Sequence, residues 1–382
     1  MDPAPPPTGH PATSTGRFTG EVVYLFAFDI AYEMDRQLPA ELLGQAVAQY
    51  SVDRSKRSPR HLLFFKPRMV RLPAQERLGP HGPVRVETEA KILAIGALSI
   101  RIRVPFAVER LSDLVAFHDL RFSNGSLADE VRQLAARIRQ ELAPSIVRPI
   151  EAIPDEEAYT VFCLRGPLAS EGPSLFRSST WLDDHRREVA ALLTQEPDVD
   201  RLSDQETVES TSRSLSYYED DLVVADWDAA LIVDEPAEWE ESLYVLELAN
   251  LQLAELEAYD RILDGNLERS YRDLANPATR SRQRLIRELR ELRIDMARFS
   301  DELSNISKFF GDWHLARLYE MIGSRFHLAD WHRSVNEKLR TVGELHEILK
   351  HDQSNRWMMI LEITIVLLFV IDLVMLFYRP GK

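Results

Sequence analysis

The stretch that decides the architecture is WMMILEITIVLLFVIDLVMLFY, which runs from Trp357 to Tyr378. Its 22 residues contain only two charged side chains, Glu362 and Asp372. A helix rises about 1.5 Å per residue, so this stretch would span about 33 Å, close to the ~30 Å hydrocarbon core of a bilayer. Aromatic and basic residues flank both ends, as they do at membrane interfaces. The stretch therefore predicts one transmembrane helix, with a buried core helix as the alternative.

The remaining sequence contains no second stretch of this kind. Residues 1–17 are rich in proline and polar side chains, which is typical of a disordered tail and not of a signal peptide. A short tail, residues 379–382, follows the span. We therefore expect a single-pass, tail-anchored protein whose bulk stays on the side of the membrane where it was made.

Two acidic residues inside the predicted span need partners. Glu362 and Asp372 would each cost a few kcal/mol in the bilayer if ionised. Ten residues separate them, about 15 Å along a helix, so they cannot pair with each other. We expect them to contact a neighbouring copy of the chain, which predicts a homo-oligomer. A proton or ion path, and acids tolerated near the interface, are the alternatives.

Helical patterns fill the region before the span. Residues 237–275 have leucines at helical spacing, and 281–310 have apolar residues alternately four and three apart, the pattern of a coiled coil. A shorter helix is expected over about 312–325, and a last one from Leu328 into the membrane. The short breaks predict antiparallel neighbours, so 235–351 should form a helical, coiled-coil-like stalk. The coiled-coil positions are Leu285, Leu289, Leu292, Met296, Phe299, Leu303, Ile306 and Phe310.

Residues 18–234 predict a mixed α+β domain. Alternating and β-branched residues indicate strands over 18–30, 83–95 and 98–108, and Ser126 can cap a helix that Pro144 ends. The lone cysteine, Cys163, lies in a predicted core strand and is expected to be a buried, inert thiol. Further elements are expected at 157–166 (strand), 181–195 (helix), and 206–217, 221–226 and 229–234 (strands).

Charge is distributed unevenly along the 382 residues. The net charge of −15 argues against a dedicated binder of duplex nucleic acid. Residues 151–241 alone carry 6 basic and 24 acidic side chains, a net −18. A solvated acidic face is the plain interpretation, and a docking surface for a basic partner or a weak divalent-cation site are the alternatives. The densest acidic run is Glu219, Asp220, Asp221, Asp226, Asp228, Asp234, Glu235, Glu238, Glu240 and Glu241.

Common catalytic motifs are missing from the sequence. It has no GxxxxGK[ST], GxGxxG after a strand, GxSxG or HExxH pattern, so we expect neither an enzyme nor a bound cofactor. Asp226 and Asp228 form a weak candidate metal pair, which a turn between short strands explains equally well. A basic stretch with nearby aromatics is either a solvated loop or a contact for phosphate or RNA. Its candidate residues are Arg54, Lys56, Arg57, Arg60, Lys66, Arg68 and Arg71.

The segment 324–374 resembles the C-terminal signature of the required-for-meiotic-nuclear-division family. The matching positions are Trp331, Asn336, Glu337, Lys338 and Leu339, followed by a single span with an acid near its start. The stretches 20–28 (GEVVYLFAF) and 216–232 (SYYEDDLVVADWDAALI) are also similar to that family. The resemblance implies a non-enzymatic membrane protein that supports translation by tethering ribosomes. Eukaryotic relatives are mitochondrial inner-membrane proteins.

These patterns lead to one main functional hypothesis. We expect an oligomeric, tail-anchored membrane scaffold whose α+β domain meets cytosolic partners, with the ribosome among the candidates and nucleic acid contacted only through it. Basic residues are mostly arginine, which suggests a bacterial genome and places the domain inside the cytoplasmic membrane. An ion-handling protein of the magnesium-channel type is an alternative, although this chain has one span and no Gly-Met-Asn loop. A metal-dependent transferase using Asp226 and Asp228 is the other.

Overall fold

The computed structural model describes residues 17–35, 38–50, 67–79, 82–93, 96–122, 125–149, 156–166, 177–275, 287, 290–291, 294 and 313–378. The chain forms two compact units. Unit 1 comprises Met1–Glu255 and Glu302–Ala329, and unit 2 comprises Leu256–Asp301 and Asp330–Lys382. Unit 1 extends past the boundary expected at residue 234, because it includes the helix that follows as far as Glu255.

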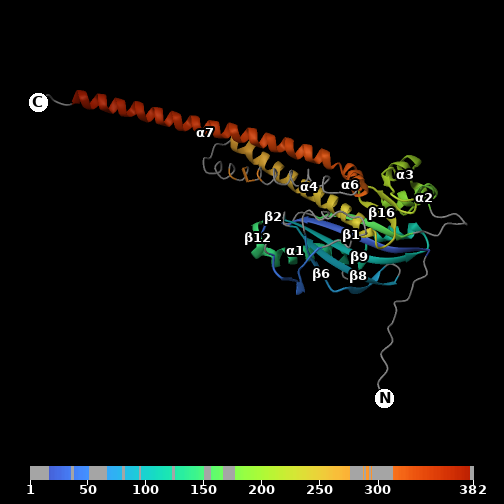
Figure 1. The fold of residues 1–382 in the computed structure, drawn as a ribbon. Coiled ribbons are helices and arrows are strands. Elements are labelled where there is room, and N and C mark those ends of the chain that lie inside the picture. The colour runs from blue at the N-terminus through green and yellow to red at the C-terminus, as the bar shows by residue number, and fades with distance from the viewer. Residues whose placement is uncertain are drawn as a thin grey trace, which may run out of the picture. The chain divides into compact units, whose positions relative to one another are not determined.

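Unit 1 is built on a ten-stranded sheet with the order β14-β15-β16-β13-β1-β9-β8-β6-β5, and β7 pairs with β8 beside this path (Figure 1). Neighbouring strands are antiparallel except β13 and β16, which are parallel. The sheet strands are β1 (Phe18–Asp29), β5 (Ala48–Gln49), β6 (Arg68–Arg71), β7 (Gln75–Gly79), β8 (Gly82–Ile92), β9 (Ala97–Val108), β13 (Glu157–Arg165), β14 (Ser214–Leu215), β15 (Leu222–Ala225) and β16 (Ala229–Asp234).

Six short strands form three separate pairs, and two-turn or shorter helices fill the connections. The strands are β2 (Ala31–Met34), β3 (Glu41–Leu42), β4 (Gln45–Ala46), β10 (Arg121–Phe122), β11 (Gly125–Ser126) and β12 (Ile146–Pro149), and they pair as β2 with β12, β3 with β4 and β10 with β11. The 3₁₀ segments are η1 (Leu111–Phe117), η2 (Ala143–Ser145) and η3 (Val199–Arg201).

The two faces of the sheet differ in chemistry. One face packs the main apolar core, in which alternate residues of β1 and β9 meet η1, α1 (Leu127–Leu142) and α2 (Ser178–Leu193). The opposite face meets the first part of α4 (Trp239–Ala275) through a small apolar cluster that includes Ala27 and Leu251. The same face of the sheet also carries charged side chains, which form the site described below.

Most elements of unit 1 match their predictions. The strands at 18–30, 83–95, 98–108 and 157–166 and the helix after Ser126 are confirmed, and the Ser126 side chain accepts a hydrogen bond from the Asp129 N–H. The strand expected over 206–217 is wrong over most of its length, and only Ser214–Leu215 of it forms a strand, β14. Residues Asp204–Ser210 form helix α3, because Ser203 caps its first turn by accepting the Glu206 N–H at 3.0 Å. The buried thiol of Cys163 is confirmed.

Helices complete both units. In unit 1, α6 (Trp313–Arg325) ends just before α7 (Leu328–Tyr378), whose unbroken course into the apolar stretch was predicted. In unit 2, α4 and α7 lie side by side, and Lys338 Nζ is 2.7 Å from both the Asp260 and Asp264 carboxylates (Figure 1). The coiled-coil positions between Leu285 and Phe310 lie outside the described residues. Residues 1–16 and 379–382 also lie outside the described residues. The antiparallel stalk therefore remains a prediction.

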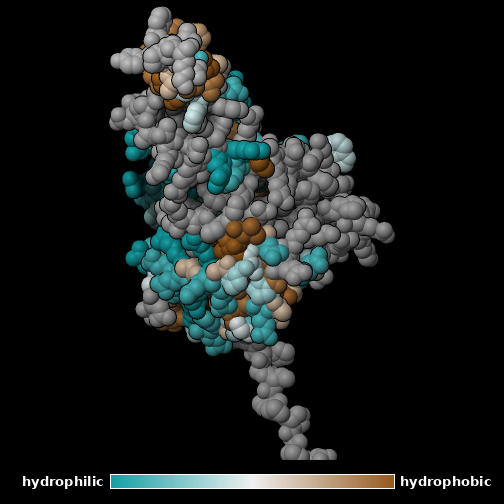
Figure 2. Space-filling view, turned by 90° about the vertical axis from the view of Figure 1, so that its left-hand side faces the viewer, coloured by the Kyte–Doolittle hydropathy of each residue, from teal (hydrophilic) through white to brown (hydrophobic). Residues whose placement is uncertain are grey.

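The apolar stretch of α7 has the dimensions of a membrane span. Trp357–Met375 has a mean hydropathy of 2.6, and none of it is buried against the rest of the protein. Its side chains give the brown surface at the apolar end of this helix (Figure 2). By length and composition the segment is consistent with a single membrane anchor.

Candidate functional site

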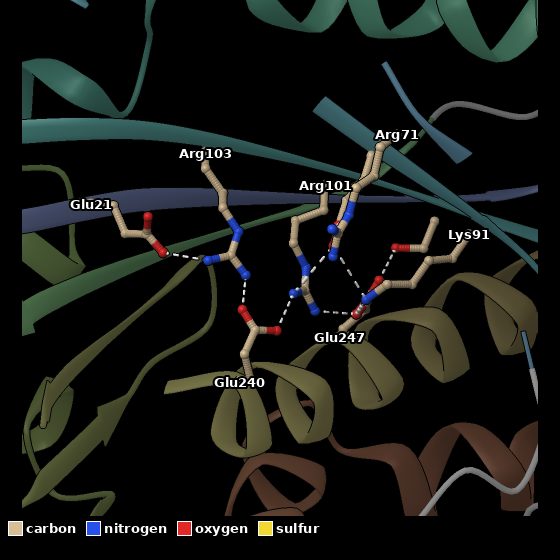
Figure 3. Close-up of polar contacts among 9 residues, drawn as sticks. Glu21, Arg71, Lys91, Arg101, Arg103, Glu240 and Glu247 are labelled. Atoms are coloured by element: carbon tan, nitrogen blue, oxygen red, sulfur yellow. Dashed lines mark hydrogen bonds and ion pairs between the residues drawn. The ribbon is translucent and has the colours of Figure 1, made fainter. Parts of the chain in front are cut away.

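A cluster of charged side chains lies between the sheet and the first part of α4, and we call it the ion network (Figure 3). In β9, Ser99, Arg101 and Arg103 are two residues apart, so they project from one face of the sheet. In β8, Lys91 pairs with Ser99 and Glu89 pairs with Arg101, which puts these two side chains on the same face. Two neighbouring central strands therefore present a row of polar groups to α4.

Helix α4 supplies the opposing carboxylates. Glu240 and Glu247 are seven residues apart, close to two turns, so they lie on one side of the helix. Glu247 Oε2 accepts hydrogen bonds from Lys91 Nζ at 2.6 Å and from Arg101 Nη2 at 2.5 Å. Glu247 Oε1 accepts one from Ser99 Oγ at 2.5 Å. One carboxylate of α4 thus joins three side chains of the sheet.

Glu240, about two helical turns before Glu247, contacts a second set of partners. Its Oε2 accepts from Arg101 Nη1 at 2.9 Å, and its Oε1 accepts from Arg103. Arg103 Nη1 in turn donates to Glu21 Oε1 of β1 at 2.7 Å. Figure 3 shows the resulting chain of contacts, which runs from β1 across β9 to α4.

Glu89 closes the network at the β6 edge. Its Oε1 lies 3.3 Å from Arg101 Nη1 and 3.6 Å from Lys91 Nζ. Arg71, one of the predicted phosphate contacts, lies 3.7 Å from Glu89 and its side chain is 74% exposed. The charges balance, because the cations Arg71, Lys91, Arg101 and Arg103 face the carboxylates Glu21, Glu89, Glu240 and Glu247.

The centre of the ion network is sealed from water. The side chains of Arg101, Lys91 and Glu247 are 0%, 2% and 3% exposed. The Tyr50 ring lies 3.9 Å from Lys91 Nζ and stacks on Tyr244 of α4 with centroids 6.0 Å apart. Charges removed from water in this way are tolerated only when they are paired and hydrogen-bonded.

The electrostatics favour the ionised form of Glu247. Burial raises the pKa of this carboxyl, but the charges of Arg101 and Lys91 and hydrogen bonds from Lys91 and Ser99 outweigh burial and lower the pKa to about 2. For Lys91, burial and the neighbouring Arg101 charge lower the pKa against the opposing pull of Glu247 and Glu89. A carboxylate held ionised and saturated with donors is suited to join two elements rather than to transfer protons.

A second cluster joins the turn between β15 and β16 to the end of α6, and we call it the hairpin clamp. Arg325 donates to Asp226 Oδ1 through Nε at 2.7 Å and through Nη2. Arg325 Nη1 also donates to Glu209 Oε1 at 3.1 Å. The same Asp226 oxygen accepts the Trp227 N–H at 2.9 Å. Asp226 is 4% exposed, so the clamp is a largely buried ion pair.

Aromatic contacts extend the hairpin clamp to the start of α7. Phe326 is fully buried and packs edge-on against Tyr159, with ring centroids 5.1 Å apart. Tyr159 Oη donates to the backbone oxygen of Asp226 at 3.0 Å. His327 stacks on Trp227 at 5.3 Å. These contacts fix Phe326 and His327, the residues just before α7, to the β15–β16 hairpin within unit 1.

The predicted metal pair lies in this turn. Asp226 is buried and bonded to Arg325, whereas Asp228, two residues on, is exposed. Among the described residues, no group of three or more His, Cys, Asp or Glu side chains is placed to hold a metal ion. The structure thus gives Asp226 a partner that the sequence did not indicate, and a metal at this pair stays a prediction.

The other predicted site residues contribute no described side-chain contact to either cluster. Arg68 is exposed on β6, and the basic positions Arg54, Lys56, Arg57, Arg60 and Lys66 fall outside the described residues. Glu362 and Asp372 are exposed on the apolar stretch of α7. The family-signature positions Trp331, Asn336, Glu337, Lys338 and Leu339 all lie on α7, where Lys338 binds α4.

Sequence reasoning did not find the ion network. The available signal was the polar set Ser99, Arg101 and Arg103 on alternate positions of an otherwise apolar strand. A second signal was the seven-residue spacing of Glu240 and Glu247. Neither pattern alone indicates which element supplies the opposite charges.

The acidic run contains one carboxyl that titrates near neutral pH. Burial raises the pKa of Asp234 from its ordinary 3.8 to about 7, against a lowering hydrogen bond from the Glu235 N–H, and the charges of Asp221, Glu238 and Asp220 add to the rise. Between pH 3.8 and 7 the folded chain holds a proton that the unfolded chain has lost, so stability falls as the pH rises.

Asp234→Asn should therefore stabilise the protein at pH 8, by about 1 kcal/mol once solvent screening is allowed for, and have little effect at pH 4. Thermal unfolding at both pH values measures this difference. Asp184→Asn, at an exposed acid of α2 elsewhere in unit 1, is the control. An equal gain at pH 4 would contradict the titration.

Comparison with known proteins gives the chain its relatives. Residues 19–239 match a family described as "Uncharacterized protein MJ0711, N-terminal domain". Over 318 residues the chain is 22% identical to "Uncharacterized protein MJ0711" of Methanocaldococcus jannaschii, covering 82% of this chain and 90% of that protein. No solved structure matches the chain. Since the family match covers more than half of the 382 residues, the chain belongs to the family of the MJ0711 N-terminal domain.

Proposed function

We propose that this protein is a non-enzymatic, oligomeric scaffold anchored in a membrane by one span, residues 357–378. The observation that carries the proposal is the apolar end of α7, where Trp357–Met375 is long enough to cross a bilayer and is not buried in the protein. A soluble protein would leave this stretch as a large exposed apolar surface, which ordinarily marks a partner or a membrane.

The two clusters described above support a mechanical role. The ion network fixes the first part of α4 to the sheet, and the hairpin clamp fixes the start of α7 to the β15–β16 turn. Helix α7 then continues without a break into the apolar stretch. A folded domain and an anchor carried on one chain suit a tether, because a partner held by unit 1 is then held near the membrane.

The proposed location is the bacterial cytoplasmic membrane, with unit 1 in the cytoplasm. The resemblance to the required-for-meiotic-nuclear-division family adds a proposed task, which is to hold the translation machinery near the membrane. Proximity labelling from the N-terminus of the full chain tests this task. Enrichment of ribosomal proteins supports it, and labelling without them would remove translation from the proposal while leaving the anchor intact.

Membrane anchoring is tested by charging the centre of the span. Leu367→Arg with Leu368→Arg should shift the chain from the membrane fraction to the soluble fraction or to aggregates, since each arginine costs about 2.5–3.5 kcal/mol at the centre of a span. Asn336→Arg with Glu337→Arg, at exposed positions earlier on α7, is the control and should remain membrane-bound. Wild-type protein that washes off membranes at alkaline pH would overturn the proposal.

Oligomer contacts in the membrane are tested by removing the two acids. If Glu362 and Asp372 meet a neighbouring copy, Glu362→Leu with Asp372→Leu should shift the detergent-solubilised protein toward monomer in light scattering, while membrane insertion improves. A second arm measures ion flux in liposomes. An unchanged oligomer together with flux that Glu362→Gln abolishes would favour the ion-handling alternative.

A further inference from the structure

An exposed group of aromatic side chains lies on unit 1 beside the start of α6, and we call it the aromatic patch. Tyr217 and Tyr218 are 56% and 60% exposed, and Trp313, the first residue of α6, is 85% exposed. The Tyr217 ring contacts Tyr218 at 4.7 Å and His314 at 5.3 Å, both edge-on. Tyrosine and tryptophan dominate binding energy at protein interfaces, and large aromatic groups are seldom left in water without a role.

The loop that carries the two tyrosines is held in place. The Asp221 carboxylate accepts the backbone N–H groups of Tyr217 at 2.7 Å and of Tyr218 at 2.9 Å. These bonds fix the loop between β14 and β15 before any partner arrives. Rigid aromatic side chains on a preorganised loop lose little conformational entropy on binding, which is the reason that binding loops use tyrosine.

Acidic groups surround the aromatic patch. Glu219 and Asp220 follow the tyrosines directly, and both are exposed. Arg177 lies 3.6 Å from Glu219, and both side chains of this pair are more than 60% exposed. The charges of Asp221, Glu238 and Asp220 each raise the pKa of nearby Asp234. The local potential at the patch is therefore negative.

We propose that the aromatic patch binds an arginine-bearing segment of another polypeptide. Guanidinium groups stack on tyrosine and tryptophan faces and pair with carboxylates, so one arginine can satisfy both features of this surface. This inference rests on the scaffold function proposed above, because a scaffold needs a partner. It adds the chemistry of that partner. A phosphate-bearing ligand fits less well, because Glu219 and Asp220 repel phosphates.

Binding is tested with the full chain in detergent and a fluorescein-labelled peptide of alternating glycine and arginine, followed by fluorescence anisotropy. The decisive variant is Tyr217→Ala with Tyr218→Ala, which leaves the net charge unchanged. We expect its Kd to rise about tenfold, since two exposed cation–π contacts contribute together about that much. The matched control is Tyr271→Ala, because Tyr271 is 56% exposed, as Tyr217 is, but lies in unit 2.

The charge contribution is tested separately. Glu219→Gln with Asp220→Asn should also weaken binding, and a glycine–lysine peptide should bind less well than the arginine peptide because arginine stacks better on aromatic rings. Asp221 is left unchanged, since it holds the loop. Unaltered melting temperatures of the variants establish that the fold is intact, and Tyr218→Phe should retain binding.

Two results would overturn the inference. Equal Kd values for wild type, the double tyrosine variant and Tyr271→Ala would show that the peptide only senses the overall negative charge. Tighter binding of a labelled oligouridylate than of the arginine peptide, lost in the tyrosine variant, would assign the patch to RNA. Either outcome is independent of membrane anchoring, because the peptide assay does not require α7 to enter a bilayer.

Discussion

Glu247→Gln should lower the free energy of unfolding of unit 1 by about 3–5 kcal/mol, the cost of breaking a buried ion pair from one side. Glu247 accepts hydrogen bonds from Lys91, Arg101 and Ser99 in a space where these side chains are almost fully buried. The amide would leave two cations in the core without their main counter-charge. Urea unfolding followed by tryptophan fluorescence measures the loss.

A control variant and a compensating set of substitutions test whether the loss comes from the buried charges. Glu268→Gln removes a carboxylate from the same helix, but there the side chain is 72% exposed and pairs with Arg272 four residues on, so its effect should stay below about 0.5 kcal/mol. Replacing Lys91, Arg101 and Glu247, the buried centre of the network, together by methionine, methionine and leucine should recover part of the lost stability, since apolar substitution of buried charges as a group is often neutral. A small loss in Glu247→Gln would mean that water reaches the network.

The same carboxylate makes the stability of the protein depend on pH under acidic conditions. The pKa of Glu247 is lowered from its ordinary 4.5 to about 2 in the folded chain, so its contribution to stability is fully present above pH 4.5 and is lost as the pH falls toward 2. Wild type should therefore lose stability over this window more steeply than Glu247→Gln, and the two unfolding curves should approach each other at low pH.

Local patterns in the sequence were sufficient to predict most individual helices and strands. The alternation in 98–108, the cap at Ser126 and the uninterrupted helical spacing from Leu328 each report on contacts within a few residues, and the structure has these elements near the expected bounds. The first part of the strand expected at 206–217 is a helix instead, because the capping bond of Ser203 outweighs a weak strand pattern, and only Ser214–Leu215 forms a strand. The continuation of unit 1 to Glu255 depends on packing against the sheet, which no local pattern records.

The ion network could not have been predicted from the sequence by the same means. Lys91 and Glu247 are 156 residues apart, and the strands that align Lys91 with Ser99 must first pair before either meets α4. The acidic run instead suggested a metal pair at Asp226 and Asp228. The residues of the acidic run lie in different parts of unit 1. Glu240 lies in the ion network, Asp226 in the hairpin clamp and Asp221 in the loop of the aromatic patch.

Arg325→Met should destabilise unit 1 by about 3 kcal/mol, because it leaves the Asp226 carboxylate 4% exposed and without its cation. Urea unfolding measures the loss, and the backbone amides of Phe326 and His327, which donate to Ile322 and Ser324, should also exchange their hydrogens faster, since both residues pack on the same hairpin. Arg333→Met is the control, because Arg333 is 68% exposed and pairs with Asp330 on its own helix, three residues away.

A double-mutant cycle separates the pair from other effects of the substitution. If Asp226 and Arg325 act as one clamp, Asp226→Asn in the Arg325→Met background should cost much less than it does in wild type, with a coupling of about 2 kcal/mol. Additive losses would contradict the clamp. Protection of the Arg325→Met variant by Mn²⁺, lost when Asp226→Asn or Asp228→Asn is added, would instead favour the metal pair, because a cation that binds only the folded state stabilises it. The cycle thus decides whether the buried carboxylate holds the start of the anchor helix or a metal ion.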